Sequence, residues 1–175
     1  MIKAIAKLIV ALNGNVKKSQ IAAGFAWGLL LALIPAGNAF WIVLLLVSFF
    51  FKHNHGSMLL GLAVLKLLLP LAASPIDTLG WEILHIDRLQ PLLTTMYNMP
   101  FVPFTKFNNT LVAGGLVSGI ILWLPAFFLF KFLVSLYRNT LSPKIRNSKI
   151  IKKIAKFPFI SAISKAVAKS IGKGA

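Results

Sequence analysis

Residues 22–51 read AAGFAWGLLLALIPAGNAFWIVLLLVSFFF and contain no ionisable side chain. A membrane-spanning helix needs about 20 predominantly apolar residues to cross a hydrocarbon core roughly 30 Å thick. The stretch is too long for one such helix and too short for two. Pro35 should end a first helix, because it lacks an N–H, and Asn38 can cap a second. We therefore predict a re-entrant hairpin of two half-length helices that enters and leaves the bilayer by the same face.

The composition predicts an all-α integral membrane protein. The chain has 175 residues, 58% of them hydrophobic, and the apolar residues come in long blocks. Cysteine is absent, which excludes disulfides and thiolate metal sites. Three acidic residues and three histidines, none placed at membrane depth, do not build a catalytic constellation or a metal cage. We expect no enzyme, no catalytic residue, no metal and no cofactor.

The charge is strongly positive and unevenly spread. Of the 19 cations that give a net charge of +16, four lie in residues 1–18 and ten in residues 138–175, while all three acids lie between Asp77 and Asp87. Cations that flank apolar blocks follow the positive-inside rule and attract anionic lipid. The pattern favours anionic membrane lipids over nucleic acid as the partner. It also predicts that both termini are cytoplasmic and that the acidic segment is periplasmic.

Within this scheme the chain divides into three parts. We expect a hairpin plus two transmembrane helices in the centre, flanked by amphipathic interfacial helices, because the hairpin puts both basic ends on one side. The expected parts are an amphipathic helix (1–18), a membrane domain (19–138) made of the hairpin (22–51), a span (57–74), a periplasmic interfacial segment (75–110) and a span (111–130), and a basic tail (139–175).

The basic tail carries isoleucines and lysines at helical spacing, which favours two amphipathic helices at the membrane surface over a disordered tail. The lysines expected to contact that surface are Lys149, Lys152, Lys153, Lys156, Lys165 and Lys169.

Two small-residue motifs predict close helix packing. Gly24 and Gly28 lie four residues apart in the hairpin, and Gly115 and Gly119 repeat this spacing in the last span. Small residues let helix backbones approach closely in lipid, although glycine is also simply more common in membrane helices. We expect the two motifs to pack against one another.

Lys66 is the cation nearest the centre of the 57–74 span. A cation at the bilayer centre costs about 2.5–3.5 kcal/mol on insertion scales, so an unpartnered one is a functional candidate. It can snorkel towards water, cap the carbonyls at the broken end of the first hairpin helix, or bind a lipid phosphate beside that end. Lys66, together with Pro35, Gly37 and Asn38, is our candidate lipid or anion contact.

Two histidine patterns point to metal only weakly. His53 and His55 have no third ligand near them in sequence, and the Glu82/His85 pair lacks the second copy that a bundle metal site needs. A polar interfacial turn is the favoured interpretation of His53 and His55.

The run Ile21-Ala22-x-Gly24-x-Ala26-x-Gly28, followed by Ile34-Pro35-x-Gly37-Asn38 with Trp41, resembles a family of small uncharacterised bacterial inner-membrane proteins, whose larger relatives belong to a membrane domain of unknown function. The resemblance covers roughly residues 19–138 and brings no activity, ligand or catalytic residue. It implies an inner-membrane location and a partnership with a larger, membrane-anchored envelope protein of the lipid-transfer kind.

We therefore expect a non-catalytic inner-membrane subunit that anchors or gates a larger envelope partner, working in lipid transport between membranes. One alternative is a small transporter or channel with a midplane anion-binding site at the broken helix. Another is a membrane-remodelling factor that acts through its basic amphipathic ends.

Overall fold

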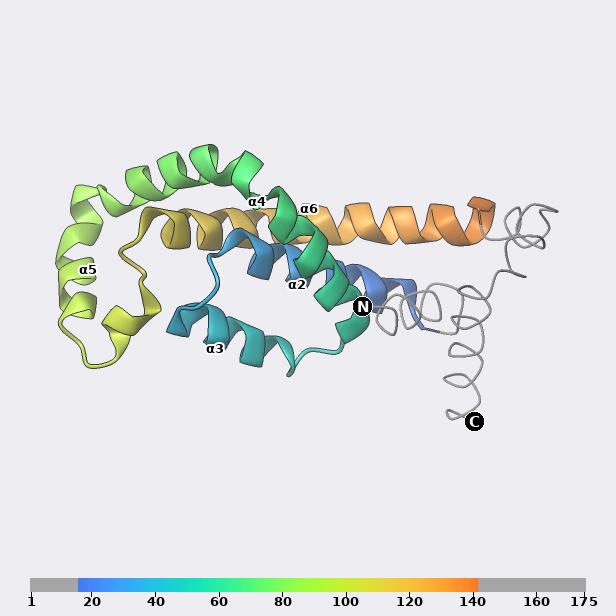
Figure 1. Ribbon diagram of the computed structural model, residues 1–175, viewed down its shortest axis with the longest axis horizontal. Coiled ribbons are helices and arrows are strands. Elements are labelled where there is room, and N and C mark those ends of the chain that lie inside the picture. The colour runs from blue at the N-terminus through green and yellow to red at the C-terminus, as the bar shows by residue number, and fades with distance from the viewer. Residues whose placement is uncertain (1–15, 142–175) are drawn as a thin grey trace.

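The computed structural model describes residues 16–141, and this part of the chain is helical and contains no strand (Figure 1). The amphipathic helix expected in residues 1–12 and the basic tail with its six membrane-facing lysines lie outside the described residues. In chain order the elements are α2 (Lys18–Leu33), α3 (Ala39–Ser48), α4 (His55–Leu84), η1 (Asp87–Leu89), α5 (Gln90–Tyr97), η2 (Val102–Thr105), α6 (Thr110–Leu136) and η3 (Tyr137–Leu141).

The helix, break and helix expected in residues 22–51 are confirmed as α2, residues 34–38 and α3. The two helices run in opposite directions, so the segment is a hairpin (Figure 1). Asn54, which follows the hairpin, donates its backbone N–H to the carbonyl of Gln20 near the start of α2, at 2.9 Å. This bond ties the end of the hairpin to its beginning. The end of the hairpin therefore lies beside the start of α2.

α2 forms the centre of the molecule, with α4 packed on one side and α6 on the other (Figure 1). Its buried residues occur all around the helix and include Ile21, Ala26 and Leu31. A helix that is apolar on every face is typical of a fully enclosed position.

The predicted contact between the two glycine motifs is wrong. A Cβ atom added at Gly28 would lie 2.7 Å from the carbonyl oxygen of Met58, and one at Gly24 would strike the backbone of Asn54, so both glycines face the start of α4. Gly115 and Gly119 instead face residues 30–34, at the far end of α2. Because α2 is enclosed on two sides, each motif brings a different pair of helices together.

The two long helices extend beyond their predicted spans. α4 has 30 residues and continues through Pro70 and Pro75, although the expected span stopped at residue 74. A proline inside a helix removes one backbone hydrogen bond and costs about 3 kcal/mol or more. Close packing offsets that cost, because a Cβ at Gly80 would strike the backbone of Thr110 in α6. α6 likewise continues beyond residue 130, to Leu136.

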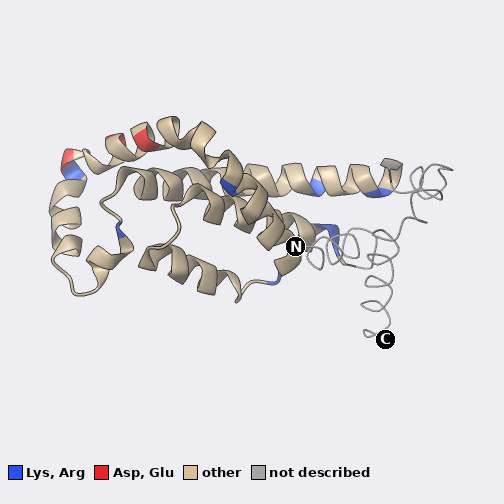
Figure 2. Ribbon diagram, in the orientation of Figure 1, with Lys and Arg blue, Asp and Glu red and all other residues tan. Residues whose placement is uncertain are grey.

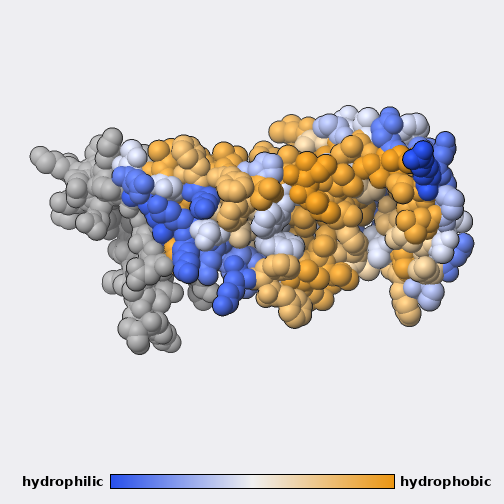
Figure 3. Space-filling view, turned by 180° about the vertical axis from the view of Figure 1, so that it is seen from behind, coloured by the Kyte–Doolittle hydropathy of each residue, from blue (hydrophilic) through white to orange (hydrophobic). Residues whose placement is uncertain are grey.

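The molecule is polarised from end to end. The acidic residues lie in the second half of α4 and in η1, with Arg88 and Lys106 near them, while the other end carries lysine at the start of α2 and lysine and arginine along and just after the second half of α6 (Figure 2). Between these ends runs a broad apolar belt (Figure 3). Two of the described helices, α4 and the one beginning at Thr110, are long and apolar enough to cross a membrane. We call the end formed by residues 85–109 the α5 end.

Candidate functional site

The candidate site is the broken end of α2, where the last carbonyls of the helix have no partner within the helix itself. Lys66 reaches this end from α4. Its Nζ donates to the carbonyl oxygen of Ile34 at 2.5 Å and to that of Ala32 at 3.1 Å. The partial negative charge of a helix C-terminus attracts a cation. Of the three roles considered for Lys66, the structure shows capping of the broken helix.

Two further side chains complete this capping. The indole Nε1 of Trp41, in the first turn of α3, donates to the carbonyl oxygen of Leu31 at 2.9 Å. The amide Nδ2 of Asn38 donates to the carbonyl oxygen of Pro35 at 2.7 Å. This role of Trp41 was not predicted from the sequence. An aromatic N–H donor three residues after a predicted cap was the available signal.

Asn38 also caps α3, as predicted. Its side-chain oxygen accepts from the backbone N–H of Trp41 at 2.7 Å, and the residue is buried. One side chain thus satisfies an acceptor on the first side of the break and a donor on the second. Gly37, beside it, has φ +89°, a conformation that suits glycine, and it lies exposed. The break, residues 34–38, is therefore a turn held by specific hydrogen bonds, and we call it the corner.

The candidate residues therefore meet in part. Lys66, Asn38 and Pro35 converge on the corner, whereas Gly37 faces outward. A lysine ammonium has three donors, and two of them are used. No group of three or more histidine, aspartate or glutamate side chains that could hold a metal occurs in residues 16–141. The corner is chemically a hydrogen-bonded joint, and its contact with a lipid or anion stays a prediction.

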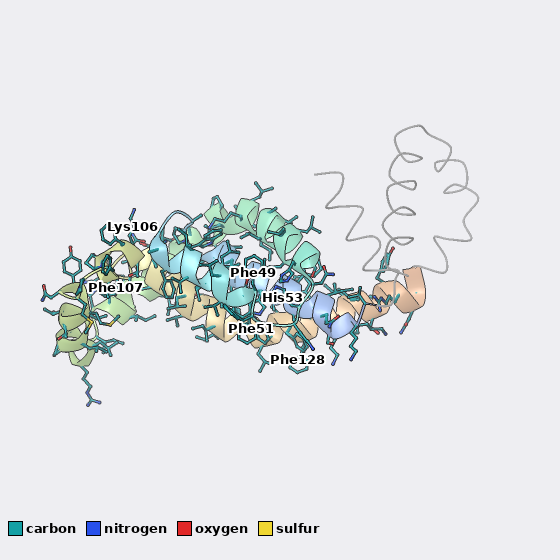
Figure 4. All side chains as sticks on the ribbon, turned by 90° about the horizontal axis from the view of Figure 1, so that it is seen from below. Phe49, Phe51, His53, Lys106, Phe107 and Phe128 are labelled. Atoms are coloured by element: carbon teal, nitrogen blue, oxygen red, sulfur yellow. The ribbon has the colours of Figure 1, made fainter. Side chains whose placement is uncertain are left out.

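A second buried polar group lies where the hairpin returns. The predicted turn is present between α3 and α4, but the His53 side chain in it is only 8% exposed and does not face outward. Its Nε2 lies 3.2 Å from the sulfur of Met58, and its ring meets the edge of the His55 ring with centroids 4.6 Å apart (Figure 4). Burial, with a smaller contribution from His55, lowers the pKa of His53 below its usual value. Its Nδ1 has no hydrogen-bond partner within residues 16–141.

A protein of Treponema pallidum, described only as an uncharacterized protein, is 37% identical to this chain over 150 residues. The match covers 86% of this chain and 93% of that protein. The chain belongs to the same family as this Treponema protein. No family model and no solved structure matches the chain.

Proposed function

We propose that this chain is a non-catalytic subunit of a bacterial inner membrane that anchors or gates a larger envelope protein engaged in lipid transfer. In this proposal α4 and α6 cross the bilayer, the α2–α3 hairpin is re-entrant, and both termini are cytoplasmic. The resemblance of residues 19–138 to small inner-membrane proteins supports the location and the kind of partner. The Treponema relative is a bacterial protein, which is consistent with a bacterial location for this chain.

The observation that carries the proposal is the uncovered surface of α3. Of its ten residues only Ser48 is buried, and Ile42, Val43 and Leu46 are each about half exposed. The helix is too short to cross a membrane and too short to be stable alone. The polar groups of the break are already satisfied by side chains of this chain, so what is left uncovered is the apolar side of α3. A transmembrane helix of a partner, packed along α3, would bury that side.

Charge supports the orientation. Lys17 and Lys18 at the start of α2 and Arg138 after α6 lie at the end where the hairpin begins. All three acids lie towards the other end, together with Arg88 and Lys106. The cytoplasmic side of membrane proteins carries the excess of lysine and arginine. In the proposed orientation the α5 end therefore faces the periplasm, where an envelope partner would be reached.

A transporter is the alternative that one observation favours. Lys66 retains one donor at the corner between two half-helices, and broken helices bind substrate at the midplane in many transporters. Anion flux through the purified chain in liposomes, abolished by Lys66→Met but not by Lys131→Met, would favour this alternative over the anchoring role.

The anchoring role can be tested by crosslinking in native membranes. A photoactivatable amino acid is placed at Ile42 on α3 and, as the matched control, at Ile121 on α6, which is 63% exposed. We expect one large membrane protein to be captured in stoichiometric amount from Ile42 and not from Ile121. Capture of lipid alone from both positions, or of the same proteins from both, would refute the proposal.

A further inference from the structure

An apolar cavity of about 390 Å³, partly open at the surface, lies beside the α5 end. Side chains from α3, α4, α5, η2 and α6 line it, among them Phe40, Met96 and Val117. Thr105 is the one polar residue in its wall, and the Thr105 hydroxyl donates to the carbonyl of Val102 at 2.6 Å. The cavity therefore presents hydrocarbon to an occupant and no unsatisfied donor from a side chain.

A second cavity, of about 570 Å³, adjoins the first. The two share three wall residues, Leu84, Leu93 and Phe107, so they lie back to back along α4 and α5. Phe107 belongs to the segment that leads from η2 to α6 (Figure 4). The second cavity differs in chemistry, because its other wall residues, from His85 to Thr110, carry polar groups, although apolar atoms still make up most of its exposed lining. We call the first cavity the apolar lobe and the second, which is the more open of the two, the polar lobe.

Some of the polar side chains in the polar lobe already form hydrogen bonds within the protein, and others do not. The Gln90 amide donates to the carbonyl of Leu84, and the Thr110 hydroxyl donates to the Asp77 carboxylate. Asn98 and Asn108 also line this lobe, and their side chains form no hydrogen bond within the described part of the chain. An asparagine amide carries two donors and one acceptor oxygen. The two asparagines thus offer both kinds of group to an occupant.

We propose that the two lobes form a binding site for one membrane phospholipid, one of whose two acyl chains fills the apolar lobe and whose head group contacts the polar lobe. Both volumes lie in the range of about 300–1,000 Å³ that is usual for small-molecule sites, and such sites combine apolar walls with a few placed polar groups. Neither lobe is lined by lysine, arginine, aspartate or glutamate. A head group in this site is therefore held by hydrogen bonds and not by a charged side chain, and the asparagine oxygens can accept from the ammonium of a zwitterionic head group.

The position of the site in the fold supplies the route for a lipid. Trp81, Tyr97, Phe101 and Phe104 are all at least half exposed around the α5 end, with Phe101 at 80%. Exposed aromatic side chains of this kind gather where the bilayer meets water. A lipid can then leave the adjacent leaflet with its head group at its usual depth. This inference relies on the membrane setting proposed above, but not on the partner.

The test uses the full chain in nanodiscs made of phosphatidylethanolamine, with a trace of the same lipid carrying a photoactivatable group in its acyl chain. Peptide mapping by mass spectrometry then locates the adducts. We expect adducts to concentrate in α5, in η2 and at the start of α6, several-fold above the exposed belt of α6 around Ile121. Adducts that simply follow exposure along the belt would overturn the proposal.

Two variants separate a filled site from a general lipid surface. Val117→Trp fills the apolar lobe and should reduce adducts there several-fold, whereas Ile121→Trp adds the same side chain on an exposed face of α6 and should not. If Val117→Trp lowers the melting temperature, Ala113→Leu takes its place as a smaller filling change in the same wall. Unchanged adducts in a folded filling variant would refute the proposal.

The proposed contact between the lipid head group and the polar lobe is tested separately. Replacing both Asn98 and Asn108 by leucine should weaken labelling in both lobes, and unlabelled phosphatidylethanolamine should compete better than phosphatidylglycerol. Equal competition would show that the polar lobe does not select the head group, which would refute that half. Crosslinking of a partner from Ile42 is read independently, so a failure of the lipid site and a failure of the anchoring role are distinguishable.

Discussion

The Nζ atom of Lys66, in α4, lies 2.5 Å from the carbonyl oxygen of Ile34, the residue that directly follows α2. This bond joins an ionic group to the open end of a helix across 32 positions of sequence. It answers two structural problems at once. The carbonyl gains a donor where the chain breaks, and the lysine gains partners within an apolar part of the fold, with no acidic side chain involved.

Removing the ammonium should therefore destabilise the corner. Lys66→Met keeps the length of the side chain but leaves the carbonyls of Ala32 and Ile34 without their donor. A buried acceptor without a partner costs about 1–3 kcal/mol. We expect a lower melting temperature in detergent or nanodiscs. Lys131→Met, which removes an exposed lysine from α6, is the control. Equal melting of Lys66→Met and the parent chain would show that the cap contributes nothing.

The glycine contacts make a second prediction. Gly24→Ala and Gly115→Ala each place a methyl group against backbone of a neighbouring helix, α4 in the first case and the end of α2 in the second. Each change should lower the melting temperature, because the helices must move apart. Ala63→Leu, which enlarges an exposed side chain on α4, is the control and should melt like the parent.

The double glycine variant then separates the observed packing from the one expected from sequence. Distant sites without shared partners usually add within about 0.3–0.5 kcal/mol. We expect additive losses, since the two glycines contact different segments. A strong coupling between them would mean that the two glycine motifs face each other after all.

The hairpin was predictable from sequence because its signals are local. Pro35 and Asn38 act on the backbone within a few residues of themselves, and the break and the cap appear where expected. The candidate role of Lys66 was also accessible, since an apolar span with one central cation demands a partner. The length of α4 was not accessible. Pro75 argues for a helix end, yet α4 continues past it and packs closely against α6 at Gly80.

The pairing of helices was inaccessible for a related reason. A glycine motif says that a helix approaches something closely, and it does not say what. Gly80 and Gly114, which bring α4 and α6 into contact, form no motif in either helix and were missed. The burial of His53 was missed because a polar run after an apolar block is typical of an interfacial turn. Its tertiary neighbour, Met58, comes from the next helix.

The buried His53 predicts a dependence of stability on pH. Desolvation lowers the pKa of His53 in the folded chain, whereas the unfolded chain keeps the ordinary value of about 6.5. Below that value the unfolded state binds more protons than the folded state, so the free energy of unfolding decreases as the pH falls. We expect the melting temperature to fall between about pH 7.5 and 5.

His53→Phe should flatten this dependence, because it keeps an aromatic ring in the same place and removes the titrating group. His85→Gln, an exposed histidine at the α5 end, is the control and should keep the parent's dependence. A pH profile that is unaltered in His53→Phe would assign the effect to another group.

Backbone conformation at the α5 end gives a further prediction. Lys106 has φ +53°, in the left-handed region that costs a residue with a Cβ about 1 kcal/mol or more. The side chain is exposed, so its loss removes little packing. Lys106→Gly should raise the melting temperature slightly, and Lys106→Val should lower it, because a β-branched residue resists this conformation. The reverse order would show that the loop holds another conformation in the membrane.

The re-entrant hairpin is tested most directly by accessibility, since the chain has no cysteine of its own. Lys52 is exposed just after α3, and Met99 is 46% exposed beyond α5. If the hairpin returns to its starting side, Lys52→Cys reacts with a membrane-impermeant maleimide only from the cytoplasm and Met99→Cys only from the periplasm. The hydrogen bond between Asn54 and Gln20 requires this outcome for Lys52, because it fixes the end of the hairpin beside the start of α2.

Labelling of Lys52→Cys from the periplasm would mean that residues 22–51 cross the bilayer completely. The joint between Lys66 and Ile34 could not then form as observed, and the anchoring role proposed for α3 would fail with it.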